Sequence, residues 1–235
     1  MSSRRLTLLH TSDLHIGSDV YPQEALVGFD QVCIQAKDRE VDAVLVAGDL
    51  FDSFRAPLES VEYVFAGLKE LDRPVFVLPG NHDTLLTGAY GVADSLPPLP
   101  ANMIVLKDPA GEILSSPELS LSVWGRPVYD HEPSFQPLAG LPSRPANSWF
   151  VAMAHGLVMD GRTGSARSSP ITVEELHDAD CDYIALGHVH VFREVTQNGP
   201  VAFYCGAPSG AQRRTAALVT LDPADGASVE TLSLN

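Results

Sequence analysis

Cysteine is scarce in this 235-residue chain, which has only three thiols. Cys33, Cys181 and Cys205 are odd in number, widely scattered and never in Cys-x-x-Cys spacing. A disulfide framework is therefore not expected, and free thiols in a reducing compartment are the natural state of such residues. We accordingly expect a cytoplasmic protein.

Long apolar runs are also missing. Nothing in the sequence approaches the ~18 consecutive apolar residues of a membrane-spanning helix. The N-terminus has two arginines and a short apolar run, but that run passes within a few residues into Thr11, Ser12 and Asp13. We therefore expect neither a membrane span nor a signal peptide.

Positively charged residues are also few. The chain has 15 Lys and Arg residues and 30 Asp and Glu residues, which gives a formal net charge of −15. An acidic surface repels phosphate backbones, which argues against broad electrostatic binding of nucleic acid. Four arginines nevertheless lie in Gly- and Ser-rich segments, at positions 162, 167, 213 and 214. Arg162, Arg167, Arg213 and Arg214 are either solvated loop charges or contacts for substrate phosphate.

Short aliphatic runs recur along the chain, and each ends in polar residues. Runs of this kind are typical of strands buried on both faces. Helical patterns lie between the early runs, after Pro22 and Pro57, and Thr172 with Glu175 predicts a capping box at a third helix. This alternation predicts an α/β fold with a parallel or mixed sheet. The five runs are residues 5–13, 41–49, 73–83, 149–156 and 181–190.

Further short strands are predicted in the middle of the chain and in its tail. Asn198-Gly199 lies at a hairpin position between two of them. We therefore expect two sheets that face each other within a single domain covering residues 1–235. The predicted strands lie in residues 103–107, 112–116, 119–125, 192–206, 216–222 and 228–234.

Side chains that bind metals stand where each of the five runs ends. In open α/β sheets, ligands bind beyond the carboxyl ends of the strands. Five independent strands would therefore deliver these side chains to one rim. In chain order they are Asp13 and His15; Asp49 and Asp52; Asn81, His82 and Asp83; His155; and His188 and His190.

Each block has a structural explanation when it is taken alone. Asp-x-His and Gly-Asp occur in ordinary caps and turns, and a lone buried histidine is commonly part of a core. The joint pattern favours a metal site, because five of the eight histidines fall at these ends. Of the others, His10 is interpreted as structural, His131 as a surface residue and His177 as an exposed helix residue.

The ligand types indicate the metal class. The candidate ligands are carboxylates, imidazoles and one amide, with no thiolate. This set suits bound Mn²⁺, Fe²⁺ or Zn²⁺ more than it suits a structural zinc site. The ligands suffice for two ions, and we expect Mn²⁺. A carboxylate shared by two ions ~3.5–4 Å apart is the general geometry of two-metal phosphoester hydrolysis.

The order of the blocks resembles that of the calcineurin-like metallophosphoesterases. The family pattern is D-x-H, G-D, G-N-H-[DE], H and G-H-x-H, and all five blocks stand here in order, from "DLH" at 13–15 to "GHVH" at 187–190. Within the family, residues 8–17, 47–57, 183–190 and 203–210 are most similar to SbcD-type DNA-repair exonucleases. Ser53 stands where serine/threonine phosphatases carry an arginine.

The resemblance implies a four-layer αββα sandwich of two mixed sheets flanked by helices. It also implies a division of ligands between two ions, with Asp49 as the bridge. His188 and His190 would then serve different ions, with Val189 turned into the fold between them. The first ion would be held by Asp13, His15 and His190, and the second by Asn81, His155 and His188.

By the same resemblance, His82 would face the leaving oxygen and Asp52 would orient it, while a metal-activated hydroxide attacks phosphorus. Asp83 is expected to be either a supporting residue or a simple cap, and Gly48, Gly80 and Gly187 are expected to permit sharp turns beneath the metals. The implied function is a dinuclear-metal-dependent phosphoesterase that cleaves phosphodiester bonds, such as a DNA exonuclease. A nucleotide or small-molecule phosphodiesterase or phosphomonoesterase is the alternative, and an inactive metal-binding scaffold is a third.

The likeness to SbcD-type exonucleases also implies an SMC-like ATPase as a partner. Those nucleases usually carry an additional C-terminal region that binds DNA and the partner. This chain ends soon after its last block, at Asn235.

Overall fold

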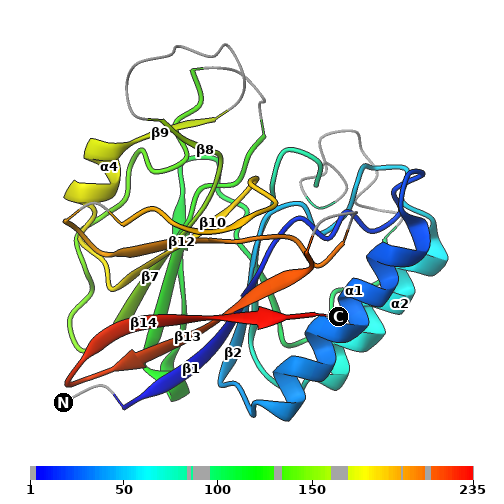
Figure 1. The fold of residues 1–235 in the computed structure, drawn as a ribbon, viewed down its shortest axis with the longest axis horizontal. Helices are drawn as coiled ribbons and strands as arrows, with labels where there is room; N and C mark the ends of the chain where they lie inside the picture. The colour runs from blue at the N-terminus through cyan, green and yellow to red at the C-terminus, as the bar shows by residue number, and fades with distance from the viewer. Residues whose placement is uncertain are drawn as a thin grey trace.

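Two six-stranded β-sheets face each other in the computed structural model of the chain (Figure 1). The structure describes residues 4–83, 86, 96–129, 134–159, 169–196, 198–209 and 213–234. Parallel strands form the centre of the first sheet, and an antiparallel pair closes one side of it. Its order is β14 (Gly226–Ser233), β13 (Thr215–Asp222), β1 (Leu6–Thr11), β2 (Ala43–Ala47), β3 (Val75–Leu78) and β4 (Met103–Val105).

The second sheet is also mixed, with antiparallel strands at both edges of a parallel centre. The antiparallel pair at one edge flanks the predicted Asn198-Gly199 turn, where Asn198 has a left-handed φ of 58°. A short parallel pair, β8 (Leu157–Met159) and β9 (Pro170–Thr172), lies outside it. The order of the second sheet is β11 (Phe192–Glu194), β12 (Val201–Cys205), β10 (Tyr183–Gly187), β7 (Trp149–His155), β6 (Leu121–Gly125) and β5 (Glu112–Ser116).

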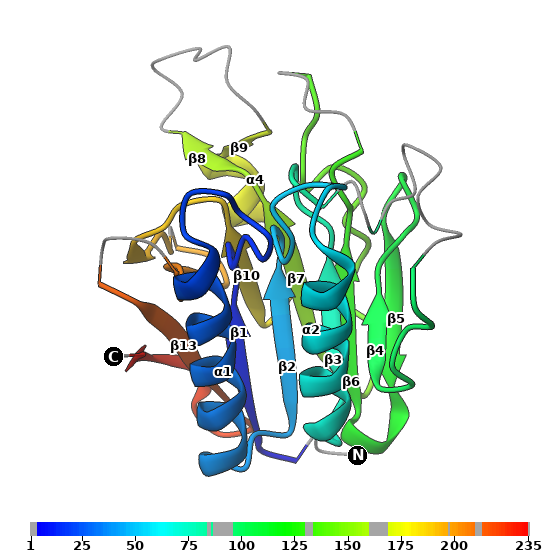
Figure 2. The ribbon, with the colours of Figure 1, turned by 90° about the vertical axis from the view of Figure 1, so that its right-hand side faces the viewer.

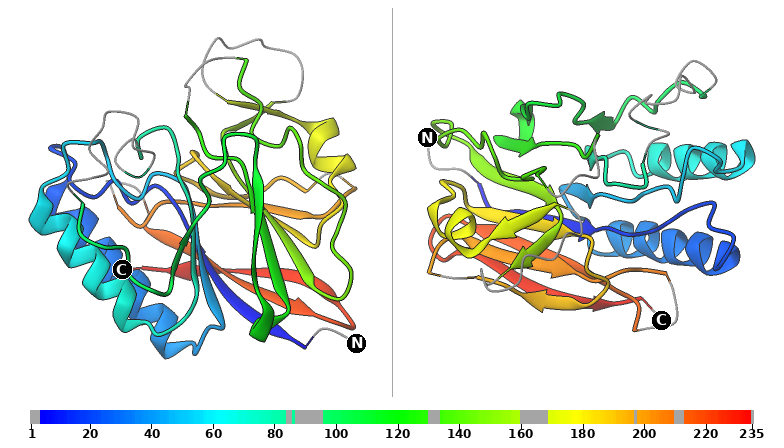
Figure 3. Two further views of the ribbon diagram at one scale, coloured as in Figure 1. Left: turned by 180° about the vertical axis from the view of Figure 1, so that it is seen from behind. Right: turned by 90° about the horizontal axis from the view of Figure 1, so that it is seen from above.

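Helices cover the outer faces. Figure 2 shows α1 (Pro22–Asp38) and α2 (Leu58–Glu70) side by side in front of the first sheet. On the far side of the molecule, α4 (Val173–Asp178) lies beside the second sheet (Figure 3). The predicted capping box is present at α4, where the Thr172 hydroxyl and the Glu175 carboxylate each accept a backbone N–H.

The strands alternate between two cores. On β1, Leu6 and Leu8 pack between the sheets, whereas Leu9 packs against the helices. On β2, Leu45 faces the other sheet and Val44 faces α1 and α2. A third core lies outside the second sheet and includes a residue of α4. The predicted fold class, two mixed sheets flanked by helices, is confirmed.

One predicted strand begins later than expected. The strand expected at 119–125 begins only at Leu121, because residues Pro117–Leu119 form a 3₁₀ turn and Ser120 has a left-handed φ of 50°. In the part of the chain that the structure describes, no helix combines the length and the apolar character needed to cross a membrane.

Candidate metal centre

The predicted blocks meet at the carboxyl ends of parallel strands from both sheets. Asp13 and Asp49 follow β1 and β2 of the first sheet within two residues, and Asn81 follows β3 within three. His155 is the last residue of β7 in the second sheet, and His188 comes directly after β10. The rim predicted from the sequence is therefore shared by the two sheets.

The loops after β1 and β2 are tied together by their backbones. Asp13 N–H donates to the Gly48 carbonyl and His15 N–H donates to the Asp49 carbonyl, each at 3.0 Å. Asp13, His15 and Asp49 have left-handed φ values of 56°, 50° and 54°, and His188 has 94°. Such backbone conformations cost roughly 1–3 kcal/mol each and cluster at functional sites.

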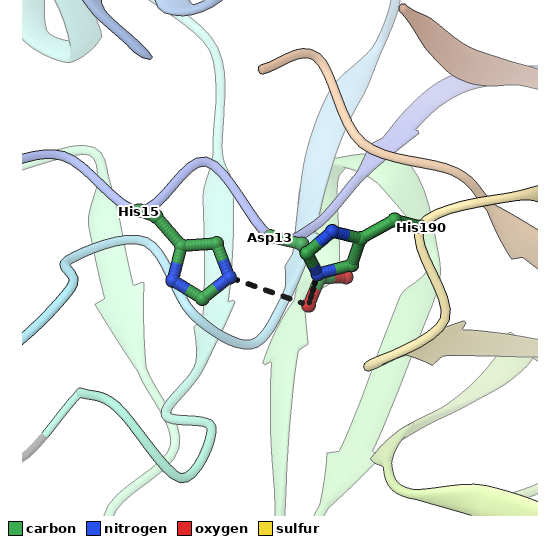
Figure 4. Close-up of side chains that lie close together, drawn as sticks. All are labelled: Asp13, His15 and His190. Carbon is green, nitrogen blue, oxygen red and sulfur yellow. Dashed lines mark ion pairs between the residues drawn. The ribbon is translucent and has the colours of Figure 1, made fainter. Parts of the chain in front are cut away.

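Asp13 is fully buried, and its two oxygens have different surroundings. Its Oδ2 accepts hydrogen bonds from the Ser12 hydroxyl at 2.5 Å and from His188 N–H at 3.0 Å. Its Oδ1 has no hydrogen-bond partner among the described residues. Nε2 of His190 lies 3.4 Å from Oδ1 and Nε2 of His15 lies 4.0 Å from it (Figure 4). One carboxylate oxygen and two imidazole nitrogens therefore converge.

A second group surrounds His155, which is also buried. Its Nδ1 lies 2.9 Å from the Ala47 carbonyl, which can only accept, so Nδ1 carries the proton of that bond. Its Nε2 lies 3.2 Å from Asp49 Oδ2 and 3.1 Å from Asn81 Oδ1. The other Asp49 oxygen accepts from His82 N–H at 2.9 Å. The Ala47 carbonyl thus aims Nε2 of His155 at a carboxylate and an amide oxygen.

The charges of this buried cluster shift the pKa values of its members. Burial opposes ionisation of Asp49, but His155 and His15 outweigh it and hold the pKa of Asp49 below its usual range. Burial likewise opposes ionisation of Asp13, and its ion pair with His190 lowers the pKa below the usual range. Burial also lowers the pKa of His155, yet the Asp49 charge dominates and raises it to about 10. Both carboxylates are therefore ionised.

Two other histidines are held neutral. Burial lowers the pKa of His15, and burial together with the nearby His155 lowers the pKa of His188 to about 4. The ring of His188 lies 5.2 Å from that of His155, between centroids. Neutral imidazole is the form that binds metal ions.

The donor atoms fit divalent metal ions. One set, Asp13, His15 and His190, has ligand atoms within 4.8 Å of one another, and so has a second set, Asp13, Asp49 and His155. Ionised carboxylates, imidazoles and an amide oxygen are ligands of Mn²⁺, Fe²⁺ and Zn²⁺. The buried Asp13 Oδ1, which lacks a hydrogen bond to any described residue, is a group that a cation would satisfy.

The Asp52 carboxylate lies within ion-pair distance of His82, which it is expected to orient, but it lies closer to His15. Its Oδ1 lies 3.2 Å from Nδ1 of His15, and 3.9 Å from Nδ1 of His82. The ring of His82 is instead held by the backbone carbonyl of Asp52, 2.8 Å from Nδ1. The Asp52 carboxylate thus lies at ion-pair distance from Nδ1 of a candidate metal ligand, although this Nδ1 makes no hydrogen bond with any described residue.

The three glycines expected to permit sharp turns are needed chiefly for close approach. A Cβ on Gly48, which has a φ of 96°, would lie 2.1 Å from Nδ1 of His155. On Gly80 it would lie 2.3 Å from Asp49 Oδ1, and on Gly187 it would lie 1.8 Å from the Ala47 carbonyl oxygen. At Gly48 and Gly187 the close contact of the two sheets leaves no room for a side chain, and at Gly80 the neighbouring loop of the same sheet leaves none.

Asp83 supports the site through the backbone. Its carboxylate accepts N–H bonds from Leu50, Phe51 and Gly80, at 3.1, 2.7 and 2.9 Å. Burial, followed by the charge of Asp49, raises its pKa to about 7, although these bonds oppose the shift. The expectation of a supporting role agrees with these contacts.

One supporting residue was not predicted. The Ser12 hydroxyl lies between Asp13 Oδ2 and the Cys205 thiol, 3.1 Å from Sγ. A serine next to an aspartate carries no sequence signal for this role, and its contact with Cys205 spans 193 residues.

The remaining candidates lie outside the centre or outside the described residues. Arg213 and Arg214 directly precede β13, whose start lies beside the end of β1, so they stand at the same rim. Arg213 is exposed and Arg214 half-buried. Arg162, Arg167 and His131 fall outside the described residues. His10 is buried and bonds to the Tyr183 hydroxyl at 2.8 Å, and His177 is exposed on α4.

Comparison with known proteins agrees with this geometry. The family model described as calcineurin-like phosphoesterase matches residues 6–192. A component of the nuclease SbcCD of Bacillus subtilis is 26% identical over 242 residues, covering 86% of this chain and 61% of that protein. The DNA double-strand break repair protein Mre11 of Methanosarcina acetivorans is 39% identical over 89 residues, covering 34% of this chain and 14% of that protein. The chain thus spans less than two thirds of these relatives.

Among solved structures, purple acid phosphatase PPD1 from yellow lupin superposes with a TM-score of 0.64 and 13% identity. The match covers 99% of this chain and 52% of that one. It shows a common fold.

Proposed function

Because the chain belongs to the calcineurin-like phosphoesterase family, whose members are hydrolases of phosphoester bonds, we propose that it cleaves phosphodiesters with two divalent metal ions. The observation that carries this proposal is that two of the three candidate metal-ligand sets among the described residues share Asp13. One set contains His15 and His190, and the other contains Asp49 and His155. Two-metal sites of this composition are typical of phosphoester hydrolysis.

The proposed ligands follow the sequence interpretation. Asp13, His15 and His190 would hold the first ion, and Asn81, His155 and His188 would hold the second. Asp49 would be shared by both, and its buried carboxylate lies within 3.9 Å of the imidazoles of His15 and His155. Mn²⁺ is the proposed metal, with Fe²⁺ or Zn²⁺ as alternatives. When bound, the ions supply Lewis acidity for the phosphoryl oxygens and for the attacking water.

The chain's own residues position these groups and move a proton. The Asp52 carboxylate lies 3.2 Å from Nδ1 of His15, and the Asp52 carbonyl fixes the ring of His82 through Nδ1. Since Nδ1 of His82 donates to that carbonyl, Nε2 is the atom that would protonate the leaving oxygen. The His82 side chain is 43% exposed, which suits a group that meets substrate from solvent.

DNA is the first substrate candidate, because two of the relatives are a nuclease component and a DNA repair protein. Arg213 and Arg214 at the rim, together with Arg162 and Arg167, are the proposed phosphate contacts. An SMC-like ATPase is the proposed partner, and it would supply the basic surface that this acidic chain lacks.

A nucleotide or another small organic phosphodiester is the second candidate. The formal net charge of −15 favours it, because a polyanion would be repelled. Phosphomonoester hydrolysis belongs to this candidate as well.

We further propose that residues 1–235 form one catalytic domain, since both sheets contribute ligands and share a core. The three cysteines are unpaired, which supports a reducing compartment and hence the cytoplasm.

The test compares hydrolysis of bis-nitrophenyl phosphate, nitrophenyl phosphate, and single- and double-stranded DNA by the Mn²⁺-loaded chain. We expect the diester to be hydrolysed faster than the monoester. DNA cleavage that weakens steeply with salt supports the first substrate candidate, and diester hydrolysis without DNA cleavage supports the second. No hydrolysis of either nitrophenyl ester by the metal-loaded chain contradicts the proposal.

A further inference from the structure

A cavity of about 210 Å³ opens beside the candidate metal centre. His15 and His190, two proposed ligands of the first ion, form part of its wall, and so does Asp52. A group bound in the cavity would therefore be a direct neighbour of a phosphoryl group at the metals. The rest of the wall comes from Leu14, Ser18, Val20, Tyr21, Ala25 and Ser209.

The remainder of the wall is mainly apolar. Leu14 and Ala25 are buried, whereas Val20 is 71% exposed and Tyr21 is 41% exposed at the start of α1. Apolar walls beside a few polar groups are the usual lining of sites for small organic ligands. A tyrosine face is also a surface on which an aromatic ring packs with a preferred geometry.

The two hydroxyls of the wall already bond to the backbone. The Ser18 hydroxyl accepts from Val20 N–H at 3.3 Å, and the Ser209 hydroxyl donates to the Asp13 carbonyl at 3.2 Å. These bonds hold the loops around the cavity.

The side chains of the wall do not favour a second phosphate as its occupant. No Lys or Arg is among the residues that line it in the described part of the chain, and it includes the Asp52 carboxylate. Apart from the two proposed metal ligands, a second phosphate would find no basic side chain in this wall and would face the Asp52 carboxylate. The small volume also limits the occupant to one ring or a group of similar size.

We propose that this cavity binds an uncharged, flat organic group, such as a nucleobase or an aryl ring, of a phosphoester whose phosphoryl group lies at the metals. This assignment rests on the proposed phosphoesterase function. Tyr21 and Val20 are its specificity-determining residues, and neither is a proposed metal ligand or proton donor.

Phenylphosphonate and methylphosphonate provide the test, because both carry the same phosphonate group and neither contains a phosphoester bond to hydrolyse. Calorimetric titration of the Mn²⁺-loaded chain should show that phenylphosphonate binds about tenfold more tightly, a difference of roughly 1.4 kcal/mol. Equal affinities for the two phosphonates would overturn the cavity assignment while leaving the metal centre intact. Failure of both to bind would instead contradict the proposed function, and with it this assignment.

Substitutions at Tyr21 and Val20 test whether these residues produce the preference for phenylphosphonate. Tyr21→Ala and Val20→Ala should each reduce the preference for phenylphosphonate and leave the affinity for methylphosphonate unchanged. Tyr63→Ala is the matched control, because Tyr63 is a tyrosine of similar exposure, 48%, on α2 and lies outside this cavity. An undiminished preference in both Tyr21→Ala and Val20→Ala, or the same loss in Tyr63→Ala, would refute the assignment.

Discussion

Replacement of Gly187 by alanine tests the close contact of the two sheets beneath the centre. A Cβ at Gly187 would lie 1.8 Å from the carbonyl oxygen of Ala47 and 2.8 Å from Nδ1 of His155. Ordinary contacts begin at 3.4 Å, so the backbone of β2 and that of β10 would have to separate by about 1.6 Å. The same movement breaks the bond from His155 Nδ1 to the Ala47 carbonyl.

Two costs set the magnitude of this effect. Overpacking of a dense interior costs about 1–3 kcal/mol, and loss of a buried hydrogen-bond partner costs about 1–3 kcal/mol more. We therefore expect Gly187→Ala to lower the free energy of unfolding by about 4 kcal/mol, out of the roughly 5–15 kcal/mol typical of a domain. Because His155 loses its orientation, metal affinity should fall as well.

Denaturant unfolding and calorimetric metal titration measure the two effects. Gly226→Ala is the control, because Gly226 has a φ of 78° and a Cβ there would meet nothing within 4 Å. It should cost only the strain of a left-handed alanine, about 1–2 kcal/mol, with metal binding unchanged. Wild-type stability and metal affinity in Gly187→Ala would refute the contact between Gly187 and Ala47.

Three further predictions concern the centre and the core. Asp49→Asn should abolish most diester hydrolysis with little loss of fold, because it removes the proposed bridging charge; full activity in the metal-loaded variant would exclude bridging. His82→Ala should slow esters of poor leaving groups more than nitrophenyl esters, and equal losses on both would rule out protonation of the leaving oxygen. Burial lowers the pKa of His10 to about 3. As the pH falls, His10 therefore takes up a proton in the unfolded chain at a higher pH than in the folded chain. Stability should therefore fall as pH drops from about 6.5 towards about 3, and the same metal-free titration of His10→Gln should show a weaker dependence.

Strand periodicity and the position of polar residues predicted much of this molecule. Continuous apolar runs marked buried strands, and the carboxyl ends of parallel strands necessarily gather at one edge. That reasoning predicted that Asp13, Asp49, Asn81, His155 and His188 share one rim, without assigning them to different sheets. The structure divides them between the two sheets and brings the sheets into contact at Asp49 and His155.

Contacts between segments that are distant in sequence could not be predicted. The Asp52 carboxylate meets His15 because the loops after β1 and β2 are joined by backbone bonds, and no local pattern encodes that pairing. Gly187 looks like an ordinary turn glycine until the Ala47 carbonyl of the other sheet lies against it. Ser12 acquires its role only because the fold brings Cys205 beside it.

The most direct test of the proposed two-metal centre is to measure the number of Mn²⁺ ions that the folded chain binds and then the hydrolysis of bis-nitrophenyl phosphate in the same sample. We predict two ions per chain, loss of hydrolysis on chelation and its return when Mn²⁺ is restored. A folded chain that binds no divalent ion, or hydrolysis that persists after chelation has removed every ion, would contradict a two-metal centre.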